Sequence, residues 1–271
     1  MLCFPNAKIN IGLNIVEKRT DGFHNIETVF YPISLCDALE IIPANKTSLT
    51  ISGIELSDQA HDNLVIKAFN MVKVDFDLPE LSIFLHKNIP LGAGLGGGSS
   101  DAAAMIRLLN KTFALGLGDD QMENYAAKLG SDCAFFIRNV PAYATQRGEI
   151  LAPVELDLAA YLFVVIKPPV HISTREAYGS IIPKKQNVSV NELIKHPIET
   201  WKNTIVNDFE SVMFSKYPKL NDIKTMLYNK GALYAAMSGS GSAIFGIFPS
   251  GDIPKIDLPD CFVWIHQPPQ N

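Results

Sequence analysis

The sequence has few cysteines, and their arrangement narrows the classes of protein that fit. Cys3, Cys36, Cys133 and Cys261 are scattered, with no C-x-x-C pair and no cluster of cysteine with histidine. This pattern argues against a structural zinc site and against a disulfide framework. Scattered free thiols are typical of proteins from a reducing compartment, so we expect the cytoplasm.

Long hydrophobic runs and an excess of basic residues are also missing. The longest apolar run, residues 158–166, is far shorter than the roughly 20 residues that a membrane-spanning helix needs. The first residues lack the basic-then-apolar layout of a signal peptide. With 23 Lys and Arg against 28 Asp and Glu, the net charge is -5. We therefore expect no membrane partner and no nucleic-acid partner. Anionic small molecules remain candidate ligands, because a local pocket can be positive in an acidic protein.

The periodicity of apolar residues predicts two layered domains. A chain of 271 residues, 47% of them hydrophobic, has room for one large or two modest domains. Alternation predicts strands over 7–19, 24–34, 37–44, 48–56, 81–90 and 161–169, with a turn at Asp21-Gly22. Helical spacing predicts helices over 62–76, 99–115 and 119–130, whereas 131–139 is typical of turn and strand. Three helices and three strands follow from residue 190, and we place the domain boundary near 155, giving domains 1–155 and 156–271.

The most unusual stretch is IPLGAGLGGGSSDAA, residues 89–103. Five of the eight residues after Pro90 are glycine, and a helical segment begins near Ser99. Three alternatives are a dinucleotide-binding turn, a P-loop and a plain turn. In a dinucleotide-binding turn, Asp119 or Asp120 would have to bind the ribose, but both lie at a predicted helix. A P-loop would need a lysine after its last glycine, and this chain has Ser99 at that position. So many glycines before a helix favour close approach of backbone N–H groups to an anion, most naturally a di- or triphosphate.

This stretch resembles the phosphate loop of the GHMP kinases, Pro-x-G-x-G-L-G-S/G-S-S-x-A. AKINIGLNI (7–15), DGFHNIETVF (21–30), HDNLVIKA (61–68), LGSDCAFF (129–136) and MSGSGSAIFGIF (237–248) resemble further motifs of one branch of that family. The blocks follow in the right order from Ala7 to Phe248, so the resemblance covers most of the chain.

The resemblance implies an α+β, two-domain GHMP kinase fold. The N-terminal half would be similar to ribosomal protein S5 domain 2, with a left-handed β-α-β connection, and the C-terminal half would be ferredoxin-like. The active site would lie in the cleft between them. The implied activity is ATP-dependent phosphorylation of the 2-hydroxyl of 4-diphosphocytidyl-2-C-methyl-D-erythritol, in the non-mevalonate route to isoprenoid precursors. ATP, Mg²⁺ and this cytidine diphosphate-linked alcohol would be the ligands of a monomer or weak homodimer.

The resemblance assigns ATP binding to the glycine-rich stretch. The residues are Pro90, Leu91, Gly92, Ala93, Gly94, Leu95, Gly96, Gly97, Gly98, Ser99 and Ser100. Ser100 is also a candidate contact for Mg²⁺. The alternative for the two serines is simple capping of the helix, and both roles can coexist.

Lys8 and Asp132 are the catalytic pair that the resemblance implies. Asp132 follows a helix-ending glycine and precedes an apolar run, so its carboxylate is expected to be desolvated and to act as a general base. Lys8 would orient that carboxylate and stabilise charge on the phosphate. The alternatives are a turn aspartate and a solvated lysine at a sheet edge.

Further residues match substrate contacts of the branch. They are Asn10, Phe23, His24, Phe30, Asn63 and Thr174, and Gly239, Ser240 and Gly241 would support the active site. An aromatic ring beside a histidine suits a nucleobase. The alternatives are core packing for Phe30, capping of a helix by Asp62 or Asn63, and an ordinary turn at Gly239.

The departures from the branch are few. Cys133 and Ala134 replace the usual Val and Pro, and Phe23 replaces Tyr. Neither change removes a group that transfers a proton or binds phosphate. The competing functions are another GHMP small-molecule kinase, a non-catalytic GHMP-like sensor of a nucleotide or sugar, and an NAD(P)-dependent oxidoreductase.

Overall fold

The computed structural model describes residues 1–54 and 63–266. Its packing forms two compact units, each built from separate segments of the chain. Unit 1 comprises Met1–Lys8, Pro32–Leu91 and Gly96–Val140; unit 2 comprises Ile9–Tyr31, Gly92–Leu95 and Pro141–Asn271. These units interleave in sequence, and the domain boundary near residue 155 stays a prediction.

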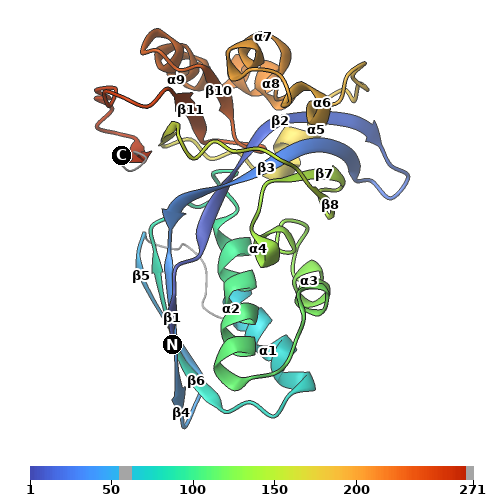
Figure 1. Cartoon of the computed structure of the whole chain (residues 1–271), viewed down its shortest axis with the longest axis vertical. Coiled ribbons are helices and arrows are strands. Elements are labelled where there is room, and N and C mark those ends of the chain that lie inside the picture. The colour runs from blue at the N-terminus through green and yellow to red at the C-terminus, as the bar shows by residue number, and fades with distance from the viewer. Residues whose placement is uncertain (55–62, 267–271) are drawn as a thin grey trace. The chain divides into compact units, whose positions relative to one another are not determined.

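Unit 1 contains a four-stranded sheet in the order β1-β4-β6-β5 (Figure 1). The strands are β1 (Leu2–Cys3), β4 (Ala38–Ala44), β5 (Ser48–Gly53) and β6 (Glu80–Lys87). β4 pairs antiparallel with β1 and β6, whereas β5 pairs parallel with β6. Because helix α1 lies between β5 and β6 in sequence, these elements form the expected β-α-β unit, whose hand stays a prediction.

The described residues of unit 1 form four helices. They are α1 (Leu64–Asp75), α2 (Gly97–Phe113), α3 (Asp119–Ala127) and α4 (Phe135–Arg138). Asn63 caps α1, since its side chain accepts a hydrogen bond of 2.9 Å from the Val65 N–H. The expectation of turn and strand over 131–139 is wrong for α4. That apolar run is too short for its period to separate a strand from one helical turn.

Strand β6 shows how the core of unit 1 is organised. Leu81, Ile83 and Leu85 alternate with more exposed residues and are buried. Lys87 continues the same inward phase and is buried as well. An ammonium group in a core position needs buried partners of opposite charge.

Unit 2 contains two four-stranded sheets. One, in the order β2-β3-β7-β8, consists of β2 (Asn6–Lys18), β3 (His24–Cys36), β7 (Ala142–Gln146) and β8 (Ile150–Pro153). The first residues of β2 and the last of β3 are counted with unit 1. The predicted turn at Asp21-Gly22 is confirmed between β2 and β3.

The other sheet of unit 2 has the order β10-β11-β9-β12, and its neighbouring strands are antiparallel. The strands are β9 (Leu162–Lys167), β10 (Tyr234–Met237), β11 (Ile244–Phe248) and β12 (Phe262–His266). When these four strands are numbered by their position in the chain, their order in the sheet is 2-3-1-4. Read from the other edge this is 4-1-3-2, the ferredoxin-like order that the resemblance implies. A ferredoxin-like sheet usually has a helix in its last crossover, but the described residues 249–261 contain none.

The segment between β9 and β10 is helical. It contains α5 (Thr174–Gly179), α6 (Val190–Leu193), the 3₁₀ helix η2 (Ile198–Thr200), α7 (Trp201–Thr204), α8 (Phe209–Lys216) and α9 (Pro218–Asn229). Phe209 and Met213 of α8 join Leu220, Ile223 and Leu227 of α9 in one hydrophobic core with the sheet. Within the described ranges, no helix is both long enough and apolar enough to span a membrane.

Candidate active site

Helix α2 begins directly after the glycine-rich turn, earlier than the sequence predicted. Its N-cap is Gly96, in the left-handed region with φ 72°, and no side chain caps the helix. The alternative role of the two serines as helix caps is therefore wrong. The first intrahelical bond runs from the Ser100 N–H to the Gly96 carbonyl, at 2.9 Å. The N–H groups of Gly97, Gly98 and Ser99 precede that bond, which makes this terminus suitable for an anion.

The glycine at the centre of the turn permits a close backbone contact in unit 2. Gly94 has φ +74°, and a Cβ there would lie 1.9 Å from the Ser238 carbonyl oxygen. The Ser238 hydroxyl donates to the Gly94 carbonyl at 2.8 Å, and the Ala243 N–H donates to Ala93 at 3.1 Å. Gly94 therefore packs directly against Ser238, the residue before the second glycine turn (residues 239–241), whose support of the active site stays a prediction.

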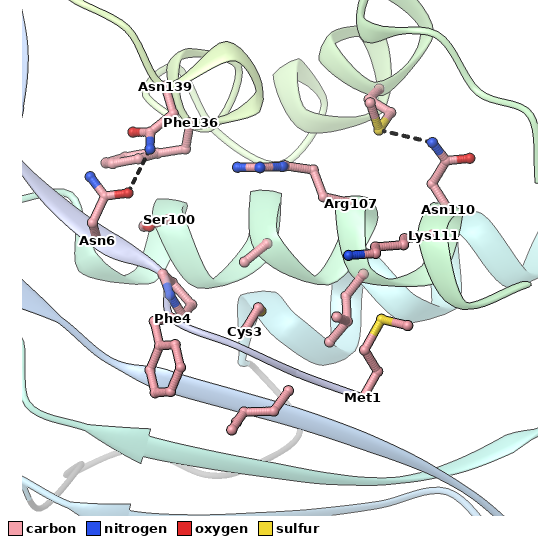
Figure 2. Close-up of a pocket in the computed structure, with 15 residues that line it drawn as sticks. Met1, Cys3, Phe4, Asn6, Ser100, Arg107, Asn110, Lys111, Phe136 and Asn139 are labelled. Carbon is pink, nitrogen blue, oxygen red and sulfur yellow. Dashed lines mark hydrogen bonds between the residues drawn. The ribbon is translucent and has the colours of Figure 1, made fainter. Parts of the chain in front are cut away.

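The two serines at the start of α2 have different surroundings. Ser100 is buried and lines a cavity of about 460 Å³ beside Arg107, Phe136 and Asn139 (Figure 2). Ser99 is half-buried, and its side chain lowers the pKa of the Cys133 thiol against the larger, raising effect of burial. The cavity is lined by no carboxylate side chain among the described residues.

Lys8 and Asp132 meet in unit 1. The Lys8 Nζ lies 3.4 Å from the Asp132 Oδ2, and the two side chains are 3% and 34% exposed. The expected desolvation therefore falls on the lysine more than on the carboxylate. Burial lowers the pKa of Lys8, and the charge of Asp132 opposes that shift. The Lys8 stem also lies 3.2 Å from where a Cβ of Gly96 would be, so the pair adjoins the end of the glycine-rich turn.

Cys133, which replaces the branch's valine, behaves as a small apolar side chain. It is fully buried, and burial raises the pKa of its thiol to about 11. A thiol with that pKa stays protonated at neutral pH, so it supplies no nucleophile. Ala134, in place of proline, is the N-cap of α4.

The predicted acceptor residues of unit 2 fall in two groups. Asn10 is buried; its N–H donates to the Ser238 hydroxyl at 3.2 Å and its amide to Thr28 at 3.0 Å. Phe23 is 51% exposed, with the Arg147 guanidinium 4.1 Å from its ring centroid. These placements connect Asn10 to the second glycine turn and leave the Phe23 ring accessible.

His24 adjoins a residue that the sequence reasoning missed. Its ring lies 5.0 Å from the ring of Tyr178 on α5, and Tyr178 in turn meets Phe209 edge-on at 4.9 Å. Burial, followed by the charge of Lys18, lowers the pKa of His24. A neutral imidazole offers one donor and one acceptor, as recognition of a base edge requires.

The remaining predicted contacts have more ordinary surroundings. Phe30 is almost completely buried, which favours the alternative of core packing. Asn63, in unit 1, caps α1, and Thr174 is exposed at the first residue of α5.

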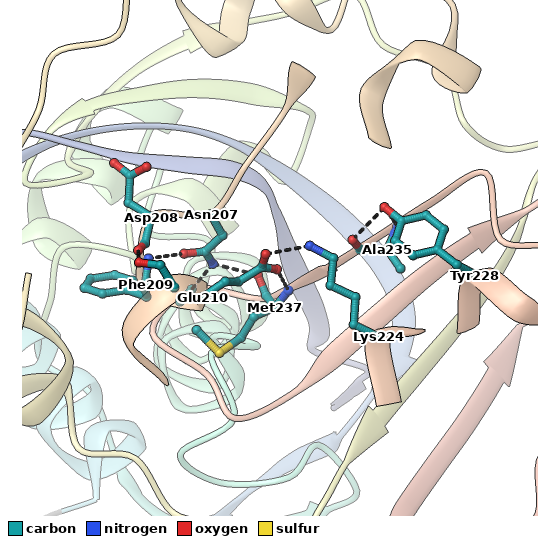
Figure 3. A network of polar contacts seen from close by, with 10 residues as sticks. Asn207, Asp208, Phe209, Glu210, Lys224, Tyr228, Ala235 and Met237 are labelled. Atoms are coloured by element: carbon teal, nitrogen blue, oxygen red, sulfur yellow. Dashed lines mark hydrogen bonds and ion pairs between the residues drawn. The ribbon is translucent and has the colours of Figure 1, made fainter. Parts of the chain in front are cut away.

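A polar network holds the second glycine turn (Figure 3). The Asn207 amide donates to the carbonyls of Met237 and Gly239, both at 2.8 Å. Glu210 accepts the Met237 N–H at 2.8 Å and the Lys224 ammonium at 2.5 Å. Sequence reasoning missed Asn207 and Glu210, because N-D-F-E at 207–210 is also typical of an ordinary helix start.

These features agree with the comparisons with known proteins. The family model for the N-terminal domain of GHMP kinases matches residues 63–139, and that for their C-terminal domain matches residues 190–256. The chain belongs to the GHMP kinase family.

Several curated relatives within this family carry the same name. The 4-diphosphocytidyl-2-C-methyl-D-erythritol kinase of Bacteroides fragilis is 53% identical over 97% of both chains. The enzyme of that name from Porphyromonas gingivalis is 46% identical over 97% of this chain and 98% of its own.

Solved structures show the same architecture. A crystal structure of 4-(cytidine 5'-diphospho)-2C-methyl-D-erythritol kinase matches with a TM-score of 0.79 and 30% identity, over 91% of this chain and 90% of that chain. The L. major mevalonate kinase in complex with R-mevalonate matches with a TM-score of 0.65 and 18% identity, over 97% and 96% of the two chains. The second match shows the shared fold alone.

We expect Gly94→Ala to weaken the binding of adenine nucleotide strongly, and by more than any accompanying loss of thermal stability would explain. The new methyl group must displace the Ser238 backbone, and the loop moves with it. Gly116→Ala is the matched control, because Gly116 has φ +71° and nothing within 4 Å of its Cβ position. Titration with ADP and thermal unfolding of both variants test this. Equal ADP affinity in the two variants would contradict it.

We expect Asn207→Asp to destabilise unit 2 by about 1–3 kcal/mol, because a carboxylate cannot donate to two buried carbonyl groups. Asn203→Asp, at an exposed position of α7, makes the same chemical change without those partners. Denaturant unfolding of the two variants measures the difference. Equal midpoints would show that the network contributes nothing to stability.

Proposed function

We propose that this protein transfers the γ-phosphoryl group of ATP to the 2-hydroxyl of 4-diphosphocytidyl-2-C-methyl-D-erythritol. The names of the curated relatives support this substrate, because the sequences of these relatives are about 50% identical to this chain over nearly its full length. The observation that carries the chemistry is the Lys8–Asp132 pair next to Gly96. That pair supplies an accessible carboxylate and a buried cation at one end of an anion-binding turn.

The glycine-rich turn would bind the phosphates of ATP mainly through its backbone. The N–H groups at the start of α2 point along the helix axis, and the helix dipole favours negative charge there. This chain has no lysine within residues 88–110, so no side-chain ammonium of the loop itself competes for that role. Backbone hydrogen bonds would therefore be the main contribution of this turn to binding the phosphates.

Asp132 would act as the general base. Its carboxylate is partly exposed, so an acceptor hydroxyl can reach it and lose its proton to Oδ1 or Oδ2. The hydroxyl oxygen then bonds to the γ-phosphorus as the bond to the β-phosphate oxygen breaks, and ADP leaves. Lys8 would keep the carboxylate in position and stabilise the negative charge on the transferred group.

Magnesium would enter with the nucleotide and would neutralise charge on its phosphates. Among the described residues there is no group of three His, Cys, Asp or Glu side chains that could hold a metal by itself. That donor set fits an ion held chiefly by phosphate oxygens, with the Ser100 hydroxyl as the candidate protein ligand.

The cytidine end of the acceptor would be recognised in unit 2. His24 and the exposed ring of Phe23 follow the same turn, and they suit a flat base better than a small aliphatic alcohol. We further propose that the reaction belongs to the non-mevalonate route to isoprenoid precursors and occurs in the cytoplasm, in a monomer or weak homodimer. Release of ADP, assayed with the cytidyl alcohol, with mevalonate and with homoserine, tests the substrate. Equal rates with all three acceptors would contradict the proposed substrate and would support only the assignment to the GHMP kinase family.

We expect Asp132→Asn to lower turnover by about 10²-fold or more while ADP still binds, because an amide cannot accept the proton. Lys8→Met should cause a similar loss, and the double variant should be little worse than either single one, because the two groups act as a unit. Asp120→Asn is a control from an exposed ion pair with Arg138 and should keep normal turnover. Additive losses at Lys8 and Asp132 would indicate separate roles.

We expect CMP and CDP to compete with the acceptor much better than UMP and UDP do. Uracil reverses the donor and acceptor on the edge that a cytosine site would bond, which leaves buried groups unpaired. His24→Ala should weaken binding of CDP and leave binding of ADP unchanged. His196→Ala, whose side chain is exposed, is the matched control. Equal inhibition by CMP and UMP would rule out recognition of the cytosine edge.

A further inference from the structure

Three charged side chains form a buried network in unit 1 that the proposed chemistry does not use. They are Asp37, Lys87 and Asp101, which are 0%, 2% and 3% exposed. The Lys87 ammonium contacts the Asp37 Oδ2 and lies 2.6 Å from the Asp101 Oδ2. One cation therefore joins two carboxyl groups from separate segments of the chain.

Each member of the network holds a different part of the chain next to the phosphate loop. Lys87 is the last residue of β6, and Asp101 lies in the first turns of α2. Asp37 precedes β4, and its Oδ1 accepts the backbone N–H groups of Asn88 and Ile89, at 2.5 and 2.8 Å. Those two donors are the residues immediately before Pro90, where the loop begins.

The network is also in contact with the loop's far end. A Cβ on Gly97 would lie 3.5 Å from the Lys87 Nζ, so the ammonium is packed directly against the first residue of α2. Asp37 fixes the segment that enters the loop, and Lys87 with Asp101 fixes the segment that leaves it. The loop is thus closed at both stems by one ion cluster.

Stability alone is a poor explanation for this cluster. Well-packed apolar side chains in place of a buried ion pair are often equally stable or more so, because charges are costly to desolvate. Here a second carboxyl group adds to that cost: the Asp101 Oδ1 is buried without a hydrogen-bond partner among the described residues, and burial raises the pKa of Asp101 to about 7. The directional bonds to both stems are what apolar packing could not supply.

We propose that Asp37, Lys87 and Asp101 are positioning residues that hold the two stems of the phosphate loop in the spacing that nucleotide phosphates require. The proposal rests on the proposed kinase function, because that function supplies the nucleotide. It assigns the network no contact with substrate. Its effect should therefore appear in nucleotide affinity more than in chemistry on bound substrates.

The test compares Asp101→Ala with Asp101→Asn in the full chain. Alanine removes the tie between Lys87 and α2, whereas asparagine keeps an oxygen for the ammonium and removes the surplus charge. We expect alanine to raise the KM for ATP and the Kd for ADP by about tenfold or more, since the loss of one hydrogen bond to a charged group typically costs that much in binding. Turnover at saturation and the KM for the acceptor should change far less. Asparagine should restore most of the nucleotide affinity.

Two controls separate positioning from loss of stability. Leu81→Ala, at a buried position of β6, should lower the midpoint of thermal unfolding without changing the KM for ATP. Glu80→Gln disrupts the partly exposed ion pair with Lys73 and should change neither KM. A purely structural network would reduce the amount of active enzyme in Asp101→Ala and leave both KM values as in wild type, which would overturn the proposal.

Hydrogen exchange gives a readout that needs no substrate. In protein without nucleotide, Asp101→Ala should accelerate exchange across residues 88–100, and Leu81→Ala should not do so selectively. Failure of the wild type to bind ADP would contradict the proposed function, while the exchange comparison would still test the network. Unchanged exchange in Asp101→Ala would overturn the proposal even if the kinase function holds.

Discussion

The contact on which the candidate site most depends is the approach of one backbone to another at Gly94. The Ser238 carbonyl occupies the place where any side chain of Gly94 would stand, 1.9 Å from an ideal Cβ. The same serine's hydroxyl donates to the Gly94 carbonyl and accepts the Asn10 N–H. The glycine turn, the second turn and strand β2 are therefore joined through one residue. A loop built in this way keeps its shape without a core of its own.

Most of the strands and helices that carry the candidate site could be predicted because their signals are local. Alternation along β2 separates Ile9 and Ile11 from Lys8 and Asn10, and the glycines precede a helical pattern at short range. The start of α2 was mispredicted for a physical reason. Serine is usually the better cap, but the left-handed turn at Gly96 brings helical geometry in earlier and places both serines inside the helix. Tertiary packing of the loop thus overrides the local preference.

The buried polar networks could not be predicted, because their partners are distant in sequence. Lys87 is separated from Asp37 by 50 residues and from Asp101 by 14. Lys87 falls on the same face of β6 as three buried aliphatic residues, so the sequence did indicate a buried cation. A buried cation requires carboxylate partners. The sequence did not indicate which carboxylates. Asn207 and Glu210 gave less warning, since amides and acids are common at the start of any helix.

The distribution of charge bears on how an acidic chain can bind two polyanionic substrates, ATP and the cytidine diphosphate-linked alcohol. The net charge is -5, and the two lysines described next to the loop, Lys8 and Lys87, are both buried against carboxylates. Neither is an exposed point charge, which would attract any phosphate. Under the proposed function, discrimination would then come from the shape of the glycine-rich turn, whose backbone N–H groups would meet phosphates at defined positions. Such a site tolerates little movement, because backbone N–H groups, unlike a lysine side chain, cannot extend to follow a displaced ligand.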